Sequence, residues 1–227
     1  MAVAAPRFGS SDEPIIPSAS VSRRALGSLL GAGVVCLLGP SAARAAFPPG
    51  SAIGGELPDL SFRMTRSSDG RVVTAGAYRG KVVVTYFGFT RCPDTCPLTM
   101  YNLALILRRM GPLASRVRVL FITIDPGYDT VPRLRRYLAQ FGPPPEIDGL
   151  RGTPAELAAM AKRYFVVYRA PSGPAAPDPV SAITHTSFVY VFESQGRAQD
   201  ILATIGNADI DVAAMAEGLA RLARAAG

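Results

Sequence analysis

The chain has 227 residues, of which 48% are hydrophobic and 18% are charged, a balance typical of a globular protein and not of a disordered one. The formal net charge is +7, but no basic stripe interleaved with aromatic residues is present, which argues against nucleic acid as a partner. Without a leader about 180 residues remain, enough for one domain with a full hydrophobic core.

Residues 1–45 have the layout of a targeting segment. Arg23 and Arg24 precede an apolar stretch that ends at Leu38, and small residues before Ala46 fit a cleavage site. The paired arginines resemble a twin-arginine signal. We therefore expect export to a bacterial periplasm through a twin-arginine-like or general secretory signal. A mitochondrial transit peptide is the alternative, and an uncleaved leader would act as a membrane anchor, although its apolar stretch is shorter than the ~20 residues of a comfortable span.

Glycine and proline are frequent in residues 46–58, which indicates a linker, so the folded domain is expected over residues 59–227. Cys36 lies in the apolar stretch of the leader and is interpreted as an apolar filler. Two short apolar runs, 60–65 and 71–74, flank the turn at Asp69 and Gly70. They predict an N-terminal β-hairpin.

Strands and helices alternate along the rest of the chain. Residues 81–89 form a nearly continuous run of β-branched and aromatic residues, typical of a strand buried on both faces. The other predicted elements are a helix over 97–110, a strand over 117–125, a helix over 130–141, a loop over 142–145, a helix capped by Thr153, a strand over 165–168, a loop over 170–179, strands over 186–192 and 197–202, and a helix over 207–225. This order predicts an α/β fold with a central mixed sheet flanked by helices.

The first chemical feature is a cysteine pair, Cys92 and Cys96, between the strand at 81–89 and the following helix. This location is typical of a thioredoxin-like fold. Positions i and i+4 of a helical turn face the same way, with Cβ atoms ~5–6 Å apart, so both sulfurs reach one ion, or form a disulfide. A helix N-terminus also favours the thiolate form. A purely structural disulfide is the competing interpretation, but the mouth of a central strand is where α/β sheets place functional groups.

The second feature is His185, the only histidine of the chain. It immediately precedes the strand at 186–192, which in a thioredoxin-like sheet would lie beside the cysteine strand and open at the same end. Two thiolates and one imidazole form a soft donor set that suits copper, whereas structural zinc would need a fourth protein ligand. The sequence therefore predicts a site for Cu(I) or Cu(II) formed by Cys92, Cys96 and His185.

Three acidic residues lie near these ligands in the sequence. Asp129 or Thr130 is expected to cap the helix at 130–141, and the alternative is that Asp125 or Asp129 supports the copper ligands. Asp94, between the cysteines, is expected to form a turn or to face a partner.

Three motifs resemble the Sco/SenC family. Residues 87–97, FGFTRCPDTCP, are similar to its signature, in which an aromatic strand end leads into Cys-Pro-Asp-x-Cys-Pro. Residues 124–130 resemble its Asp-Pro element, with Tyr128 where the family usually has arginine. Residues 184–186 resemble its histidine element, with Thr184 and Thr186 in place of the common Asp and Ser. The motifs occur in the family's order and cover roughly residues 57–223.

The resemblance implies a thioredoxin-like copper chaperone with Cys92, Cys96 and His185 as copper ligands. It implies delivery of copper to, or reduction of the cysteines of, the binuclear copper site of cytochrome c oxidase. The implied partners are the copper-site subunit of that oxidase and another periplasmic copper chaperone or a thioredoxin-like reductase. Two rival functions use the same residues: a thiol-disulfide oxidoreductase with an attacking and a resolving cysteine, and a peroxidase-like protein whose first cysteine attacks peroxide.

Overall fold

The computed structural model describes residues 57–143, 146–169 and 184–226. The predicted targeting segment at 1–45, with Cys36, lies outside these residues, as do nearly all of the predicted linker and the predicted loop at 170–179. Within the described ranges, no helix is long and apolar enough to cross a membrane.

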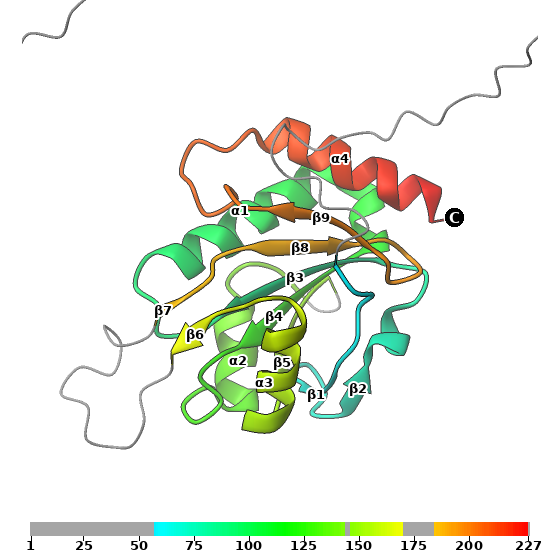
Figure 1. The fold of residues 1–227 in the computed structure, drawn as a ribbon. Helices are drawn as coiled ribbons and strands as arrows, with labels where there is room; N and C mark the ends of the chain where they lie inside the picture. Colours follow the sequence, from blue (N-terminus) through cyan, green and yellow to red (C-terminus); the bar gives the residue numbers. More distant parts are fainter. Residues whose placement is uncertain (1–56, 144–145, 170–183, 227) are drawn as a thin grey trace, which may run out of the picture. The chain divides into compact units, whose positions relative to one another are not determined.

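A seven-stranded sheet forms the centre of the domain, with the strand order β2-β1-β5-β4-β3-β8-β9 (Figure 1). Its strands are β1 (Arg63–Arg66), β2 (Val72–Thr74), β3 (Val82–Gly88), β4 (Val117–Thr123), β5 (Ile147–Arg151), β8 (Val189–Phe192) and β9 (Ala198–Leu202). β3, β4 and β5 are parallel, and the remaining pairs are antiparallel. The sheet is therefore mixed, and the hairpin of β1 and β2 is the predicted N-terminal extension.

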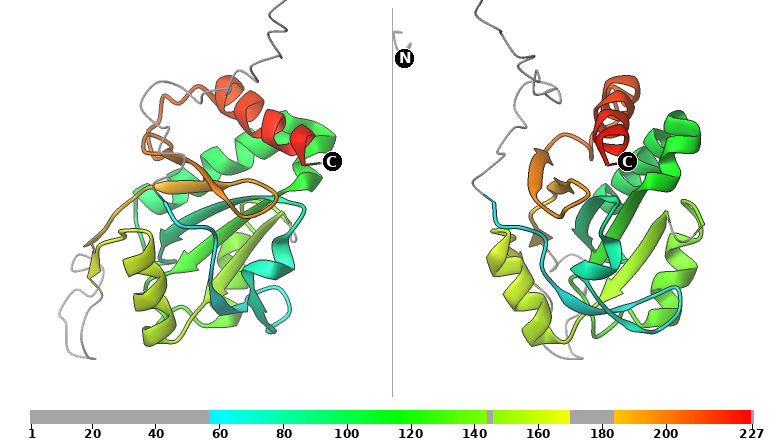
Figure 2. Two further views of the ribbon diagram at one scale, coloured as in Figure 1. Left: turned by 45° about the vertical axis from the view of Figure 1, so that its right-hand side comes forward. Right: turned by 90° about the vertical axis from the view of Figure 1, so that its right-hand side faces the viewer.

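Helices cover both faces of the sheet. They are α1 (Thr95–Met110), α2 (Val131–Leu138), α3 (Pro154–Arg163) and α4 (Val212–Ala225), with two short 3-10 helices, η1 (Ala75–Tyr78) and η2 (Gly111–Arg116). In the colours of Figure 1, the views of Figure 2 show α1, α2 and α4 on one face and α3 on the other. A separate two-stranded ribbon pairs β6 (Tyr168–Arg169) with β7 (Thr184–His185). The predicted α/β, thioredoxin-like architecture is confirmed.

The core is centred on β3 and β4. All seven residues of β3 are buried, as are all but one of the residues of β4, because helices on both sheet faces leave neither strand a solvent-facing side. On α1, Met100, Leu103 and Ile106 recur at helical spacing and are at most 1% exposed. This packing fixes the C-terminal end of β3 and the start of α1, the junction that carries the cysteine pair.

Several predicted boundaries shift. Helix α1 begins at Thr95, two residues before the predicted start, so Cys96 lies in its first turn. The Thr153 cap of α3 is confirmed, because its Oγ1 accepts a hydrogen bond from the Glu156 N–H at 3.2 Å and the Glu156 carboxylate accepts one from the Thr153 N–H at 2.9 Å.

Three strands differ from the prediction. No strand was predicted between the proline-rich loop and Thr153, where β5 pairs with β4 on one side and β1 on the other. The strand predicted at 165–168 is reduced to Tyr168–Arg169, because Phe165 adopts a left-handed backbone with φ of 56° that interrupts an extended run. The strand predicted at 186–192 is also shorter, and its first residues lead from β7 into β8.

Candidate metal centre

The cysteine pair lies where β3 leads into α1. Cys92 is partly exposed in the connecting loop, and Cys96 is fully buried in the first turn of the helix. The Cys96 backbone N–H donates a hydrogen bond to the Cys92 sulfur over 3.4 Å. Both residues are free thiols in this structure. The loop thus brings the two side chains together as their spacing predicted, although only Cys96 belongs to the helix.

The two thiols differ in acidity because of their mutual contact. The Cys96 side chain donates a hydrogen bond to the Cys92 sulfur, and His185 and backbone N–H groups add to this effect, which lowers the pKa of Cys92 to about 4 against the cost of burial. The same contact, together with burial, raises the pKa of Cys96 far above its ordinary value. In the metal-free pair, Cys92 is therefore the thiolate and Cys96 keeps the proton.

His185 reaches the cysteines from a distant part of the chain. The antiparallel register of β8 against β3 pairs Val189 with Tyr86, so the segment that precedes β8 lies at the C-terminal end of β3, as predicted. There the Nε2 atom of His185 is 3.6 Å from the Cys96 sulfur. The Nδ1 atom lies 3.0 Å from the Thr186 carbonyl oxygen. Because a carbonyl only accepts, Nδ1 carries a proton, and Nε2 is the ring nitrogen that faces the sulfurs.

Aromatic side chains hold the imidazole in place. The rings of Tyr86 and Phe89 meet the His185 ring edge-on, with centroids 6.1 and 5.9 Å away. The Tyr86 hydroxyl also donates a hydrogen bond to the Cys96 sulfur over 3.4 Å. Tyr86 was not among the site residues predicted from the sequence. The one feature that could have identified Tyr86 is its place in the strand, two residues before Gly88 and on the face of β3 that meets α1.

The three predicted ligands are near one another but are not arranged as a formed metal site. In the part of the chain that the structure describes, no group of three or more His, Cys, Asp or Glu side chains has the spacing to hold a metal ion. The donor types nevertheless fit copper, because thiolate sulfur and imidazole nitrogen are its preferred protein ligands. For both atoms to bind one ion, the side chains must adjust from the 3.6 Å contact between the Cys96 sulfur and His185 Nε2.

The acidic residue expected to cap α2 has a different role. Asp129 is fully buried, and its carboxylate accepts hydrogen bonds from the Thr90 N–H at 3.0 Å, the Thr90 hydroxyl at 2.5 Å and the Thr123 hydroxyl at 2.6 Å. Burial raises the pKa of this carboxyl, against the lowering effect of these donors. Thr130 occupies the cap position without a side-chain hydrogen bond. The prediction is therefore right for the cap position, which Thr130 occupies, and wrong for a side-chain capping bond, while Asp129 links the ends of β3 and β4 beside the cysteine loop.

Asp125 anchors the residue that precedes the first cysteine. The Arg91 guanidinium forms an ion pair with Asp125 at 2.6 Å and stacks on the Tyr128 ring 4.1 Å from its centroid. Arg133 also stacks on Tyr128, at 4.2 Å. Tyr128, the departure from the family pattern, thus lies between two guanidinium groups. Asp94 is exposed and makes no side-chain capping bond.

Several known proteins and solved structures are similar to this chain. "Protein SCO2 homolog, mitochondrial" of Bos taurus is 36% identical over 133 residues, which are 58% of this chain and 48% of that protein. The solved structure of Bradyrhizobium japonicum ScoI with copper bound is 30% identical, has a TM-score of 0.59, and is matched over 73% of this chain and 98% of its own. The structure of Arabidopsis thaliana ScoI with copper bound is 29% identical with a TM-score of 0.61, over 77% of this chain and 99% of its own.

The relatives therefore include mitochondrial and bacterial proteins, and the chain spans about half the length of the first curated relatives it matches. A family model described as SCO1/SenC matches residues 55–223, a range that contains the cysteine pair, Asp125, Asp129 and the histidine. On this match the chain belongs to the SCO1/SenC family.

Proposed function

We propose that this protein binds copper through Cys92, Cys96 and His185 and delivers it during assembly of cytochrome c oxidase. The observation that carries the proposal is the approach of His185 Nε2 to within 3.6 Å of the Cys96 sulfur, across 89 positions of sequence. Copper-bound structures of two relatives, from Bradyrhizobium japonicum and Arabidopsis thaliana, support copper as the cargo.

The residues around the pair suit both capture and release of copper. Cys92 is the partly exposed thiolate that meets the incoming ion first, because its pKa is lowered to about 4. Loss of the Cys96 proton then supplies a second sulfur. The Thr186 carbonyl fixes the imidazole with Nε2 facing the sulfurs. Three protein ligands leave a coordination position open to a thiolate of the acceptor, so the cargo can be passed on by ligand exchange.

The proposed setting is the bacterial periplasm, reached through the targeting segment at 1–45, with membrane attachment if the leader stays uncleaved. The proposed acceptor is the subunit of cytochrome c oxidase that carries the binuclear copper site. Another periplasmic copper chaperone would supply the ion, or a thioredoxin-like reductase would keep the cysteines reduced.

Metal analysis tests the copper-binding part of the proposal. The folded, reduced protein loaded with copper should hold one ion per chain, and Cys92→Ser, Cys96→Ser or His185→Ala should each lower the affinity by about 10- to 100-fold or more. Cys36→Ser removes the third cysteine and is the matched control, which should bind as the unmodified chain does. Full affinity in Cys92→Ser or His185→Ala would contradict the proposal.

A thiol-disulfide oxidoreductase is the second candidate, favoured by the unequal acidity of the two cysteines. The Cys92 thiolate would attack one sulfur of a target disulfide and release the other as a thiolate. Cys96 would then attack the mixed disulfide, which leaves the target reduced and the pair oxidised. A thioredoxin-like reductase would return the two electrons. Unchanged disulfide turnover in His185→Ala, together with no copper uptake by the unmodified chain, would select this function.

A further inference from the structure

A pocket lined by several cations lies at the opposite end of the sheet from the cysteine pair. It has a volume of about 330 Å³ and is lined by Arg66, Ser68, Ala77, Tyr78, Arg79, Lys81, Arg118 and Asp148. Lys81 directly precedes β3, whereas Cys92 follows its far end. A strand of this length spans roughly 23 Å, so the pocket is separate from the candidate metal centre.

The register of the sheet explains why these side chains meet. Arg118 pairs with Val83, two positions from Lys81, so Arg118 and Lys81 lie on the same sheet face. On the neighbouring strand Asp148 pairs with Leu120, two positions from Arg118, which places it on that face as well. Residues 77–79, at the end of η1, close the pocket. The cations are thus brought together by the regular sheet.

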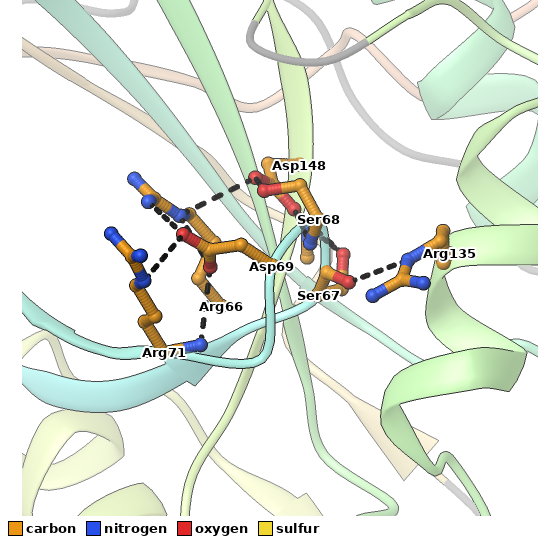
Figure 3. A network of polar contacts seen from close by, with 8 residues as sticks. Arg66, Ser67, Ser68, Asp69, Arg71, Arg135 and Asp148 are labelled. Atoms are coloured by element: carbon orange, nitrogen blue, oxygen red, sulfur yellow. Dashed lines mark hydrogen bonds and ion pairs between the residues drawn. The ribbon is translucent and has the colours of Figure 1, made fainter.

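The pocket carries more positive than negative charge. Its four cations face Asp148 within the lining and Asp69 beside it, an excess of two formal positive charges. Figure 3 shows Arg66 between the two carboxylates: it pairs with Asp69 at 2.5 Å and lies 4.0 Å from Asp148.

The Asp148 carboxylate is already well supplied with donors. It is 4% exposed and accepts from the Ser67 hydroxyl at 2.6 Å, the Ser68 N–H at 3.0 Å, the Ser68 hydroxyl, and the Gly149 N–H at 2.8 Å (Figure 3). These bonds hold the turn that carries Arg66 and Ser68. They also use most of the acceptor capacity of the Asp148 carboxylate, so little of it remains for hydrogen bonds to the other cations of the pocket.

Three of the cations have no carboxylate partner within the described part of the chain. Arg79 donates to the Gln195 carbonyl at 2.5 Å, Lys81 to the Ser115 carbonyl at 3.1 Å, and Arg118 to the carbonyls of Ser115 and Val117. Each of these bonds uses only part of the donor capacity of an ammonium or guanidinium group. The backbone therefore fixes the three head groups while other N–H donors remain for a ligand.

Tyr78 supplies an independent sign of a ligand. It is 6% exposed and lines the pocket, and within the described ranges only the Arg66 guanidinium interacts with its hydroxyl, without the geometry of a full hydrogen bond. Burial raises the pKa of Tyr78, so the hydroxyl is a neutral donor. A guanidinium only donates, so Arg66 leaves the hydroxyl hydrogen of Tyr78 unused. Because buried hydroxyl groups nearly always use their hydrogen, this group indicates an acceptor from outside the chain.

We propose that this pocket binds a phosphate-class anion, held by Arg79, Lys81 and Arg118 and by the Tyr78 hydroxyl. Phosphate matches the site better than a carboxylate does, since it has several acceptor oxygens and a charge of about −2 at neutral pH. Free phosphate, a phosphorylated small molecule and a phospholipid headgroup all present this group. The proposal does not depend on copper binding, and Cys92→Ser should leave the pocket unaffected.

Calorimetric titration of the full, metal-free chain with inorganic phosphate at constant ionic strength tests the site. The unmodified chain should bind phosphate in preference to chloride. Arg118→Gln and Lys81→Gln should each weaken binding by about tenfold, and Tyr78→Phe by about threefold. Arg136→Gln, which changes an exposed arginine on α2, is the matched control and should bind as the unmodified chain does. Circular dichroism identifies any variant that fails to fold.

A parallel experiment distinguishes the sources of the phosphate group. The same proteins are sedimented with vesicles of phosphatidylcholine that contain or lack phosphatidic acid. Binding to phosphatidic acid that Arg118→Gln and Tyr78→Phe reduce would assign the pocket to a headgroup, and a response to inorganic phosphate alone would assign it to a small solute. Equal binding by all variants, or no binding in either experiment, would overturn the proposal.

Discussion

At the scale of single residues, the cysteine pair is divided into a reactive and a protected thiol. Cys92 is partly exposed and its pKa is lowered to about 4, chiefly by the hydrogen bond from Cys96. Cys96 is fully buried, and the Tyr86 hydroxyl donates to its sulfur at 3.4 Å. A copper ligand and an attacking thiolate both need the deprotonated form, so this division serves either of the two functions considered above.

Alkylation measures the division directly. In the reduced, metal-free Cys36→Ser background, iodoacetamide should modify Cys92 much faster than Cys96. Since a lowered pKa keeps the thiolate populated, the rate at Cys92 should persist to about pH 5 and fall only as the pH approaches 4.

Substitution of Cys96, whose side chain donates to the Cys92 sulfur, is the control for the lowered pKa of Cys92. Cys96→Ala should move the midpoint of Cys92 alkylation towards the value of about 8.5 that is ordinary for cysteine. A midpoint already near that value in the parent, or equal modification of both thiols, would contradict the assignment.

Asp129 links the ends of β3 and β4 beside the cysteine loop through hydrogen bonds from Thr90 and Thr123. Asp129→Asn replaces an acceptor of three hydrogen bonds with a group that must place N–H donors against Thr90 or Thr123. The free energy of unfolding should fall by about 2 kcal/mol, measured by urea denaturation. Asp94→Asn, at an exposed site in the same loop region, should change it by less than about 0.5 kcal/mol. If Asp129→Asn and Asp94→Asn changed the free energy of unfolding equally, the hydrogen bonds of Asp129 would not stabilise the contact between the strand ends.

Residue types and spacing name the candidate ligands but not their surroundings. The cysteine spacing, the single histidine and the order of the three motifs suffice to propose Cys92, Cys96 and His185. The contacts of Tyr86, Arg91 and Asp129 depend on which strand ends lie side by side, so no local pattern reveals them. For this reason Asp129 was expected, as an alternative to Thr130, to cap the helix predicted at 130–141, which it directly precedes in the sequence.

At the scale of elements, the strands with long apolar runs, β3 and β4, were predicted, whereas β5, whose apolar run is interrupted, was not. β3 and β4 are long runs of β-branched and aromatic residues, and both were predicted. β5 has the sequence IDGLR, in which Asp148 and Gly149 interrupt the apolar run. Its strand conformation comes from pairing with β4 and β1, an effect of tertiary structure that overrides a low local propensity.

β5 contains a glycine at position 149 because neighbouring side chains leave no room for a Cβ atom. A Cβ atom there would lie 2.9 Å from Leu138 Cδ1 and 2.9 Å from Ser67 Oγ. Gly149→Ala should therefore lower the free energy of unfolding by about 1–3 kcal/mol, measured by thermal or urea unfolding. Gly76→Ala is the matched control, since its Cβ would meet only Thr74 Oγ1 at 3.5 Å. A loss no larger at Gly149 than at Gly76 would show that β5 is not packed this tightly.

At the scale of the whole molecule, the sheet separates two kinds of chemistry. The carboxyl ends of the parallel strands carry the thiols, and the histidine reaches them through the antiparallel β8. The opposite ends carry the cation-lined pocket. Copper binding should join the β3–α1 loop to the β7 segment, which is distant in sequence, and so stabilise the folded state by about 2.7 kcal/mol at a free copper concentration 100 times the dissociation constant.

X-ray absorption spectroscopy of the copper-loaded chain tests the three-ligand site most directly. The spectrum of the unmodified protein should require two sulfur neighbours and one imidazole nitrogen for each copper ion. Cys92→Ser and Cys96→Ser should each remove one sulfur, and His185→Ala should remove the imidazole while leaving both sulfurs. A spectrum with fewer than two sulfurs in the unmodified protein, or an imidazole signal that persists in His185→Ala, would contradict the proposed site.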